Sequence, residues 1–352
     1  MWIIFWIGLL IVSITVLVKA SDFFTDSAEK IGIFLGIPQF IVGVTFVAVG
    51  TSLPELISSL IAVGKGASEI VVANVVGSNI TNVFLVLGFA AVICKKISIK
   101  HDILKIDLPL LLGTAFLLGI QIYDGIYTTF EAVLSIISML LYFAYTLYHK
   151  HDEVEHIKDK SSKKNTSHKK TTSKESGKTA LSKKKTEKKV DEKDKTGKKK
   201  LGIWPIIILI LSGVGIYLGA EYTILAVLKI SEIMKIGTEI IAVGAIALGT
   251  SLPELAVTIS AAKKGNTGMI AGNVLGSNIF NATLVMGVSG LAGNLIIPAN
   301  IIAFGLPLMI IATILFVVTT QDRKITLWEG LSFLLFYVFF IGNIVREILL
   351  AY

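Results

Sequence analysis

Residues 41–88 read IVGVTFVAVGTSLPELISSLIAVGKGASEIVVANVVGSNITNVFLVLG, and residues 240–287 read IIAVGAIALGTSLPELAVTISAAKKGNTGMIAGNVLGSNIFNATLVMG. The two stretches align without gaps at a constant offset of 199 residues, and 23 of the 48 positions are identical. General hydrophobicity would match Ile, Leu and Val, but here GTSLPEL and GSNI match letter for letter. The chain therefore contains an internal duplication.

The sequence around these repeats is that of an integral membrane protein. The chain is 53% hydrophobic and 16% charged, with a mean hydropathy of +0.77, whereas soluble domains are about 25% charged. Its apolar residues fall in long runs, and a run of about 18 or more predicts a membrane-spanning helix. A β-barrel would instead show short alternating segments. We expect an all-α fold with ten transmembrane helices, at about 2–20, 38–63, 69–93, 104–122, 126–148, 202–220, 236–262, 268–293, 299–319 and 327–349. The first and sixth helices are expected to continue through Asp22–Leu35 and Glu221–Ile230.

A basic segment, residues 149–200, divides the chain in half. It holds 19 Lys and 9 acidic residues, a net charge of +10, while the rest of the chain carries −2. Its composition cannot bury a core, so we expect a disordered linker between two five-helix repeats, 1–148 and 201–352. Because the net positive charge is confined to this linker, the high pI does not indicate a nucleic-acid partner.

The distribution of Lys and Arg predicts the orientation. With the linker in the cytoplasm, the short loops on that side carry more Lys and Arg than those on the opposite side. Both termini are then extracellular, in a multi-pass cell-membrane protein. Five helices per half is an odd number, so the second repeat would enter the membrane upside down. Inverted repeats of this kind place a binding site near the membrane midplane.

Two carboxylates are the first candidate site residues. Glu55 and Glu254 lie well inside apolar segments, at equivalent repeat positions. An ionised side chain at that depth costs at least about 2.5–3.5 kcal/mol, so a matched pair indicates a shared cation site.

Their neighbours can supply further oxygen atoms. Thr51 and Ser52 precede Glu55 by four and three residues, which places all three on one helix face. Pro54 cannot donate to the carbonyl four residues back, which frees backbone oxygens around Ala48–Gly50. The second repeat has the corresponding residues Thr250, Ser251, Pro253 and Glu254, with freed oxygens around Ala247–Gly249.

The next helix in each repeat adds two pairs on one face, Ser78 with Asn82 and Ser277 with Asn281. Asn79 and Asn278 are interpreted as helix-packing residues, and Gly77 and Gly276 as points of close helix approach. All these ligands are oxygen atoms, which suits a hard cation, above all Ca²⁺. Two carboxylates neutralise either one Ca²⁺ or two Na⁺, as a competitive exchanger requires.

The doubled GTSLPE and GSNI motifs resemble the α-repeats of the sodium/calcium exchanger family, in the calcium/cation antiporter superfamily. The resemblance implies two inverted five-helix repeats that exchange Na⁺ for Ca²⁺ by alternating access, as the long first and sixth helices slide. It implies that Glu55 and Glu254 bridge calcium and sodium positions. The other ligands that it implies are Thr51, Ser52, Ser78, Thr250, Ser251, Ser277 and the carbonyls of Ala48 and Ala247. Prokaryotic relatives often carry Asp at the place of Asn281. This chain lacks that carboxylate, and its absence disfavours both potassium cotransport and proton coupling.

Other functions remain open from the sequence. The main alternative is an antiporter that couples Ca²⁺ to protons or moves another divalent cation. A cation channel and a membrane-anchored interaction protein are alternatives of different classes. No nucleophile–base pair or phosphate-binding loop indicates an enzyme, so no catalytic residue and no cofactor is expected. Expected partners are Na⁺, Ca²⁺ and the lipid bilayer, and a monomer would suffice for transport.

Overall fold

A computed structural model of the protein describes residues 2–34, 47–99, 107–145, 202–263, 265 and 267–350. The predicted linker, residues 149–200, lies outside these ranges, as do the first six residues of the first repeat motif. The described residues among 1–139 and 201–352 form one compact unit, and residues 140–200 are assigned to a second.

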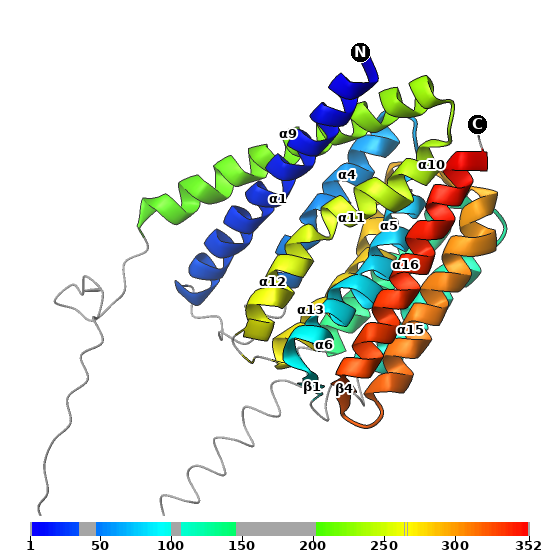
Figure 1. The fold of residues 1–352 in the computed structure, drawn as a ribbon. Coiled ribbons are helices and arrows are strands. Elements are labelled where there is room, and N and C mark those ends of the chain that lie inside the picture. Colours follow the sequence, from blue (N-terminus) through cyan, green and yellow to red (C-terminus); the bar gives the residue numbers. More distant parts are fainter. Residues whose placement is uncertain are drawn as a thin grey trace, which may run out of the picture. The chain divides into compact units, whose positions relative to one another are not determined.

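Helices make up most of the described chain (Figure 1). Before the linker these are α1 (Trp2–Phe34), α3 (Val47–Thr51), α4 (Leu53–Gly64), α5 (Glu69–Thr81), the π-helix η2 (Asn82–Leu87), α6 (Gly88–Cys94), α7 (Leu108–Ile122) and a helix at Thr129–Tyr145. After it come α9 (Ile203–Met234), α10 (Thr238–Ile241), η4 (Ala242–Ile246), α11 (Ala247–Thr250), α12 (Leu252–Lys263), α13 (Thr267–Phe280), η5 (Asn281–Val285), α14 (Met286–Ala292), η6 (Ile301–Gly305), α15 (Leu306–Thr320) and α16 (Leu327–Leu350).

Seven helical stretches in the described chain are long and apolar enough to cross a membrane. They are Ile3–Gly32, Glu69–Cys94, Ile203–Met234, Thr238–Lys263, Thr267–Ala292, Ile301–Thr320 and Leu327–Leu350. Three further apolar helices, Leu53–Gly64, Leu108–Ile122 and Thr129–Tyr145, are shorter. The ten predicted spans therefore remain a prediction, because residues 38–46, 104–106 and 146–148 of the corresponding predicted spans lie outside the described ranges.

The two helical stretches that carry the GSNI motif lie at the centre of the larger unit. Glu69–Cys94 is 94% buried and Thr267–Ala292 is 83% buried over their most apolar windows, against 22% for α1, α9 and α16. The outer helices expose large apolar side chains such as Ile4, Trp204 and Leu335. Apolar outer surfaces around a polar centre are the arrangement that a lipid solvent favours.

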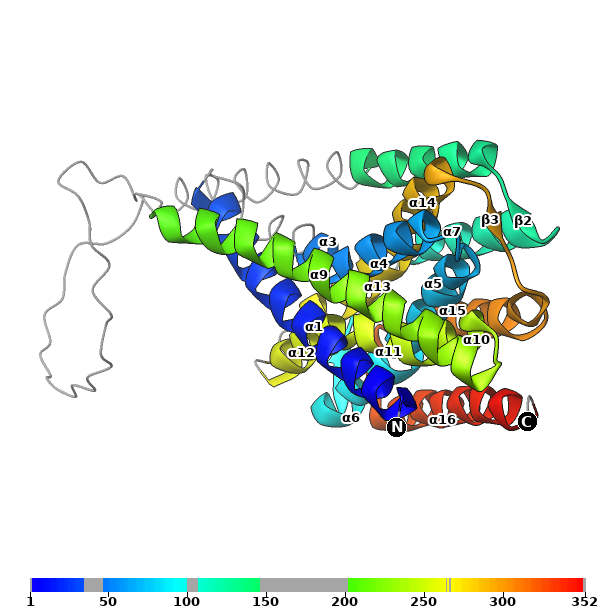
Figure 2. The same cartoon turned by 90° about the horizontal axis from the view of Figure 1, so that it is seen from above.

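The first and sixth predicted helices are long, and they pack against each other. As predicted, α1 continues to Phe34 and α9 to Met234. They lie together on one flank of the larger unit, while α16 lies on another (Figures 1 and 2). Gly219 allows this contact, because a Cβ there would lie 2.9 Å from the backbone nitrogen of Leu17.

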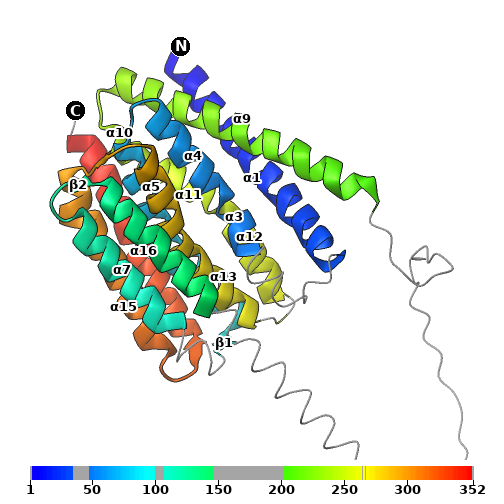
Figure 3. The ribbon, with the colours of Figure 1, turned by 180° about the vertical axis from the view of Figure 1, so that it is seen from behind.

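Two short antiparallel strand pairs join the halves of the chain. β1 (Lys96–Ser98) pairs with β4 (Lys324–Thr326), and β2 (Ile126–Tyr127) pairs with β3 (Leu295–Ile296). β1 and β2 are labelled at different ends of the helices in Figure 3. Strands of two or three residues carry almost no periodic signal, so the sequence did not predict them.

The two helices that carry the GTSLPE motif are both interrupted just before their glutamates. In the first repeat the break falls at Ser52, between α3 and α4, and in the second it falls at Ser251, between α11 and α12. Pro54 and Pro253 explain both breaks, because a proline ring removes one helical hydrogen bond and crowds the preceding turn. This position of the break agrees with the sequence interpretation.

Candidate cation-binding site

The two glutamates lie in the first turns of α4 and α12, and both are fully buried. In each carboxylate, Oε2 has no hydrogen-bond partner in the protein. A buried acceptor left without a partner costs about 1–3 kcal/mol, and more when it is charged. Glu55 and Glu254 therefore each offer an oxygen atom that a bound cation would satisfy.

Hydroxyl groups from both repeats bind Glu254. Ser52 donates to Glu254 Oε1 across a distance of 3.0 Å, although the two residues are 202 positions apart. Ser277 donates to the same oxygen at 3.2 Å, and Thr51 is buried next to Ser52 in the chain. Ser52 of the first repeat therefore helps to hold the carboxylate of the second.

Glu55 has only part of the corresponding contacts. Ser78 donates to Glu55 Oε1 at 3.5 Å, whereas the hydroxyl of Ser251, the counterpart of Ser52, has no hydrogen-bond partner. The hydroxyls of Ser78 and Thr250 are 3.4 Å apart, and each lies 3.5 Å from the carbonyl oxygen of Ala247. Hydroxyls of both repeats therefore gather at each carboxylate, directly at Glu254 and through Ser78 at Glu55.

Three other predicted ligands are buried with unpartnered polar atoms. They are the Ser251 hydroxyl, Asn82 Oδ1 and both side-chain polar atoms of Asn281. Asn82 and Asn281 are also the first residues of the π-helices η2 and η5. Single π-turns inside α-helices are frequent at functional sites.

The predicted backbone oxygens have different surroundings. The carbonyl of Ala247 still accepts the Ser251 N–H at 3.1 Å as well as the two hydroxyl contacts. The carbonyl of Gly50, which Pro54 leaves without its helical donor, accepts a hydrogen bond from Ser21 of α1 at 2.9 Å. Ala48 lies within α3, one turn before Ser52.

Sequence reasoning missed one pair of asparagines and underestimated another. Asn74 Oδ1 accepts from the Thr250 hydroxyl at 3.3 Å, and Asn273 donates to the backbone oxygen of Glu254 at 3.3 Å. Both are identical at the repeat offset and lie one turn before Ser78 and Ser277, so the alignment contained this signal. The asparagines interpreted as packing residues, Asn79 and Asn278, contact each other across the two repeats.

The chemistry of the site is that of oxygen ligands only. Within the described residues, no group of three or more His, Cys, Asp or Glu side chains gathers. Two carboxylates with hydroxyl, amide and carbonyl oxygens match the preferences of Ca²⁺ and other hard cations.

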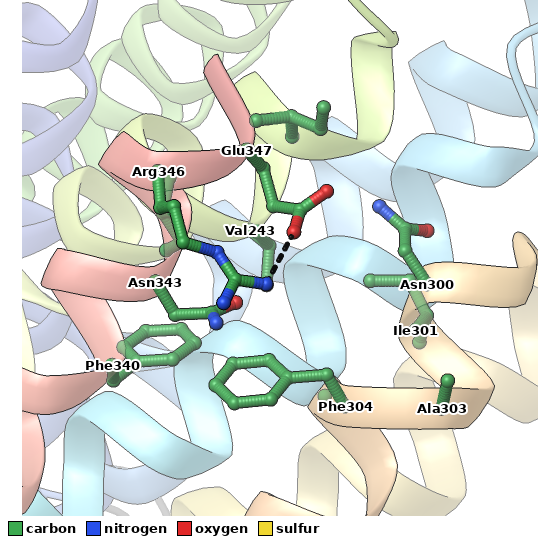
Figure 4. A pocket seen from close by; sticks show the side chains of 12 residues that line it. Val243, Asn300, Ile301, Ala303, Phe304, Phe340, Asn343, Arg346 and Glu347 are labelled. Atoms are coloured by element: carbon green, nitrogen blue, oxygen red, sulfur yellow. Dashed lines mark hydrogen bonds and ion pairs between the residues drawn. The ribbon is translucent and has the colours of Figure 1, made fainter. Parts of the chain in front are cut away.

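A separate cavity lies between η4, η6 and α16 (Figure 4). It has a volume of about 250 Å³, apolar walls that include Phe304 and Phe340, and an Arg346–Glu347 ion pair of 3.3 Å at its edge. None of the predicted ligands lines this cavity. The oxygen network around Glu55 and Glu254 is therefore the candidate site.

Known proteins are similar to this chain over nearly all of its length. The family model described as "Sodium/calcium exchanger protein" matches residues 5–149 and 204–345. The chain is 37% identical over 342 residues to the sodium/calcium exchanger MaX1 of Methanosarcina acetivorans, covering 95% of this chain and 96% of the relative. It is 29% identical over 286 residues to the inner membrane protein YrbG of Escherichia coli, covering 81% and 79%.

The fold is also similar to solved structures of the sodium-calcium exchanger NCX_Mj. The structure soaked with 100 mM Na⁺ and 10 mM Sr²⁺ has a TM-score of 0.63 and 26% sequence identity, covering 97% of this chain and 98% of that chain. The structure soaked with zero Na⁺ and Ca²⁺ has a TM-score of 0.60, with coverage of 97% and 99%. The likeness thus includes both repeats.

Proposed function

This chain belongs to the sodium/calcium exchanger family, and on that premise we propose that it exchanges Na⁺ for Ca²⁺ across a cell membrane. The family consists of transporters and not enzymes, and its members are multi-pass membrane proteins. One observation carries the proposal for this chain. Glu55 and Glu254 are fully buried, each accepts a hydrogen bond from a serine hydroxyl, and each keeps one unpartnered carboxylate oxygen.

Charge balance supports competition between the two ions. Two carboxylates neutralise one Ca²⁺ or two Na⁺, so the same site can hold either load but not both. Ca²⁺ takes about 6–8 oxygen ligands, and the site offers that many from the two repeats. The proposed ligands are Glu55, Glu254, Thr51, Thr250, Ser52, Ser251, Ser78, Ser277, Asn82, Asn281 and the carbonyls of Ala48 and Ala247.

We infer ten spans in two inverted repeats. The strand pairs support this arrangement, because the offset of 199 residues relates β1 to β3 and β2 to β4. Exchanging the two repeats therefore converts the β1–β4 pair into the β3–β2 pair. This is the behaviour expected of halves related by a two-fold axis.

Alternating access would come from movement of α1 and α9 against the central helices. They are, with α16, the least buried of the long helices, and they pack against each other. Ser21 of α1 also reaches the broken motif helix through the carbonyl of Gly50. A displacement of α1 would therefore change the hydrogen bonding next to the site.

The charge distribution supports extracellular termini and a cytoplasmic linker. Accessibility of cysteines introduced near Trp2 and Leu350 to an impermeant thiol reagent in intact cells tests this orientation. Labelling that occurs only in opened cells would reverse it.

Ion flux into proteoliposomes tests the function directly. Vesicles that contain the purified protein are loaded with sodium and placed in radiolabelled calcium, with potassium-loaded vesicles and an imposed pH gradient as comparisons. We expect uptake that requires internal sodium and saturates at carrier rates. Uptake driven by the pH gradient alone would replace sodium with the proton, and flux at channel rates would exclude an exchanger.

A further inference from the structure

Two asparagines hold the central helices of the two repeats together. Asn79 of α5 donates from Nδ2 to the backbone oxygen of Asn278 at 3.3 Å, and Asn278 of α13 donates to the backbone oxygen of Asn79 at 3.4 Å. The residues are 199 positions apart and almost fully buried. We call this reciprocal contact the amide clasp.

Asn278 makes a second contact that Asn79 does not. Its Oδ1 accepts a hydrogen bond from Asn82 Nδ2 at 3.1 Å. The counterpart atoms in the other repeat, Asn79 Oδ1 and Asn281 Nδ2, are both buried and without a partner. One of the two equivalent asparagines, Asn82, is therefore oriented by a neighbour, and the other is not.

The orientation of an asparagine amide decides whether it can bind a cation. The amide carries an oxygen acceptor at one end and an NH₂ donor at the other, and only the oxygen coordinates a hard cation. Because Asn278 engages the NH₂ end of Asn82, Asn82 Oδ1 is left without a donor and available for coordination. Rotation of the amide would place two positive hydrogens at the ion and would break this bond.

We propose that Asn278 is a positioning residue, which holds the Asn82 amide so that its oxygen faces the transported cation. The proposal rests on the proposed function, since it assigns a role within the same site. Asn278 uses its Nδ2 for the amide clasp and its Oδ1 for Asn82, so the structural and the positioning roles belong to different atoms.

A double-mutant comparison separates these roles. In the otherwise unchanged protein, Asn278→Ala is expected to raise the KM for Ca²⁺ by roughly two- to tenfold, the worth of one hydrogen bond. The maximal rate should change little. In Asn82→Ala the amide is absent, so nothing is left for Asn278 to orient. There the same substitution should change KM by less than about twofold, the ordinary error of additivity.

Asn79→Ala is the matched control, because it removes one bond of the amide clasp and leaves the contact between Asn278 and Asn82 in place. We expect its KM for Ca²⁺ to stay close to that of the unchanged protein. Asn278→Leu, which keeps the volume of the side chain, provides a second variant should Asn278→Ala fail to fold. Ca²⁺ binding is measured on every variant, with the calcium-dependent rise in Tm as the readout.

The outcomes distinguish the two hypotheses. An equal rise of KM in both backgrounds, or a rise as large in Asn79→Ala, would reduce Asn278 to helix packing and overturn the inference. An unchanged KM in Asn278→Ala and Asn278→Leu would do the same. If the unchanged protein binds Ca²⁺ but shows no sodium-dependent uptake, the proposed function fails, and the binding measurements still decide the role of Asn278.

Discussion

Replacing Glu254 by Gln is the most direct perturbation of the proposed site. The substitution keeps the size of the side chain and removes one of the two negative charges of the site. Glu254 is fully buried and accepts from Ser52 at 3.0 Å and from Ser277 at 3.2 Å through Oε1. A glutamine oxygen can still accept from these hydroxyls, so the surrounding helices should remain in place.

The loss in affinity follows from Coulomb's law. Two unit charges about 4 Å apart interact by about 4 kcal/mol at an effective dielectric constant of about 20. A divalent ion feels about twice this, and the amide oxygen recovers part of it. We therefore take about 4 kcal/mol as the loss, which corresponds to roughly a thousandfold weaker Ca²⁺ binding. At ordinary calcium concentrations, exchange should become undetectable, and Glu55→Gln should behave alike.

The assay combines transport with ligand-dependent stability. Sodium-dependent calcium uptake is measured in proteoliposomes, and Tm is measured with and without Ca²⁺. A ligand at about a hundred times its Kd stabilises the folded state by about 2.7 kcal/mol, so the calcium-dependent rise in Tm should vanish in the variant. Glu232→Gln is the matched control, because it makes the same Glu-to-Gln change at an exposed position of α9. It should leave both measurements unchanged.

Two results would refute the reasoning. The first is calcium exchange by Glu254→Gln at a rate comparable to that of the unchanged protein. The second is a retained calcium-dependent rise in Tm, which would place the ion elsewhere. Loss of exchange in Glu232→Gln would show instead that the substitution acts through folding or insertion.

Three further predictions concern other parts of the chain. Gly77→Ala should destabilise the protein by about 1–3 kcal/mol and slow exchange, because a Cβ there would lie 2.6 Å from the backbone oxygen of Val243. Gly113→Ala is the control and should do neither, because its new Cβ meets nothing within 4 Å. Equal values of Tm for the two variants would contradict this prediction. Ser21→Ala removes the hydrogen bond to the carbonyl at the α3–α4 break and should lower stability by about 1–3 kcal/mol, measured as Tm in detergent. Deletion of residues 155–198 should leave sodium-dependent calcium uptake intact, and an inactive but well-inserted deletion variant would assign the linker a role in transport.

Local patterns along the chain were enough to predict several features. The repeats, the apolar runs and the placement of Glu55 and Glu254 inside them depend only on residue type and spacing. The breaks before these glutamates follow from Pro54 and Pro253, since a missing N–H acts within one turn. The lengths of α1 and α9 were also predicted from the sequence, because an amphipathic pattern continues beyond each apolar run.

Only the tertiary structure decided which side chains meet. Ser52 donates a hydrogen bond to Glu254 and not to the glutamate of its own repeat. Asn278 accepts a hydrogen bond from Asn82, whereas the equivalent residues Asn79 and Asn281 make no such contact. These pairs lie about 200 positions apart, so they depend on how helices cross and on the side-chain rotamers there. Equivalent residues of a duplicated sequence carry identical local signals, and no local signal can tell which of two equivalent asparagines is oriented. Packing between the repeats makes that choice.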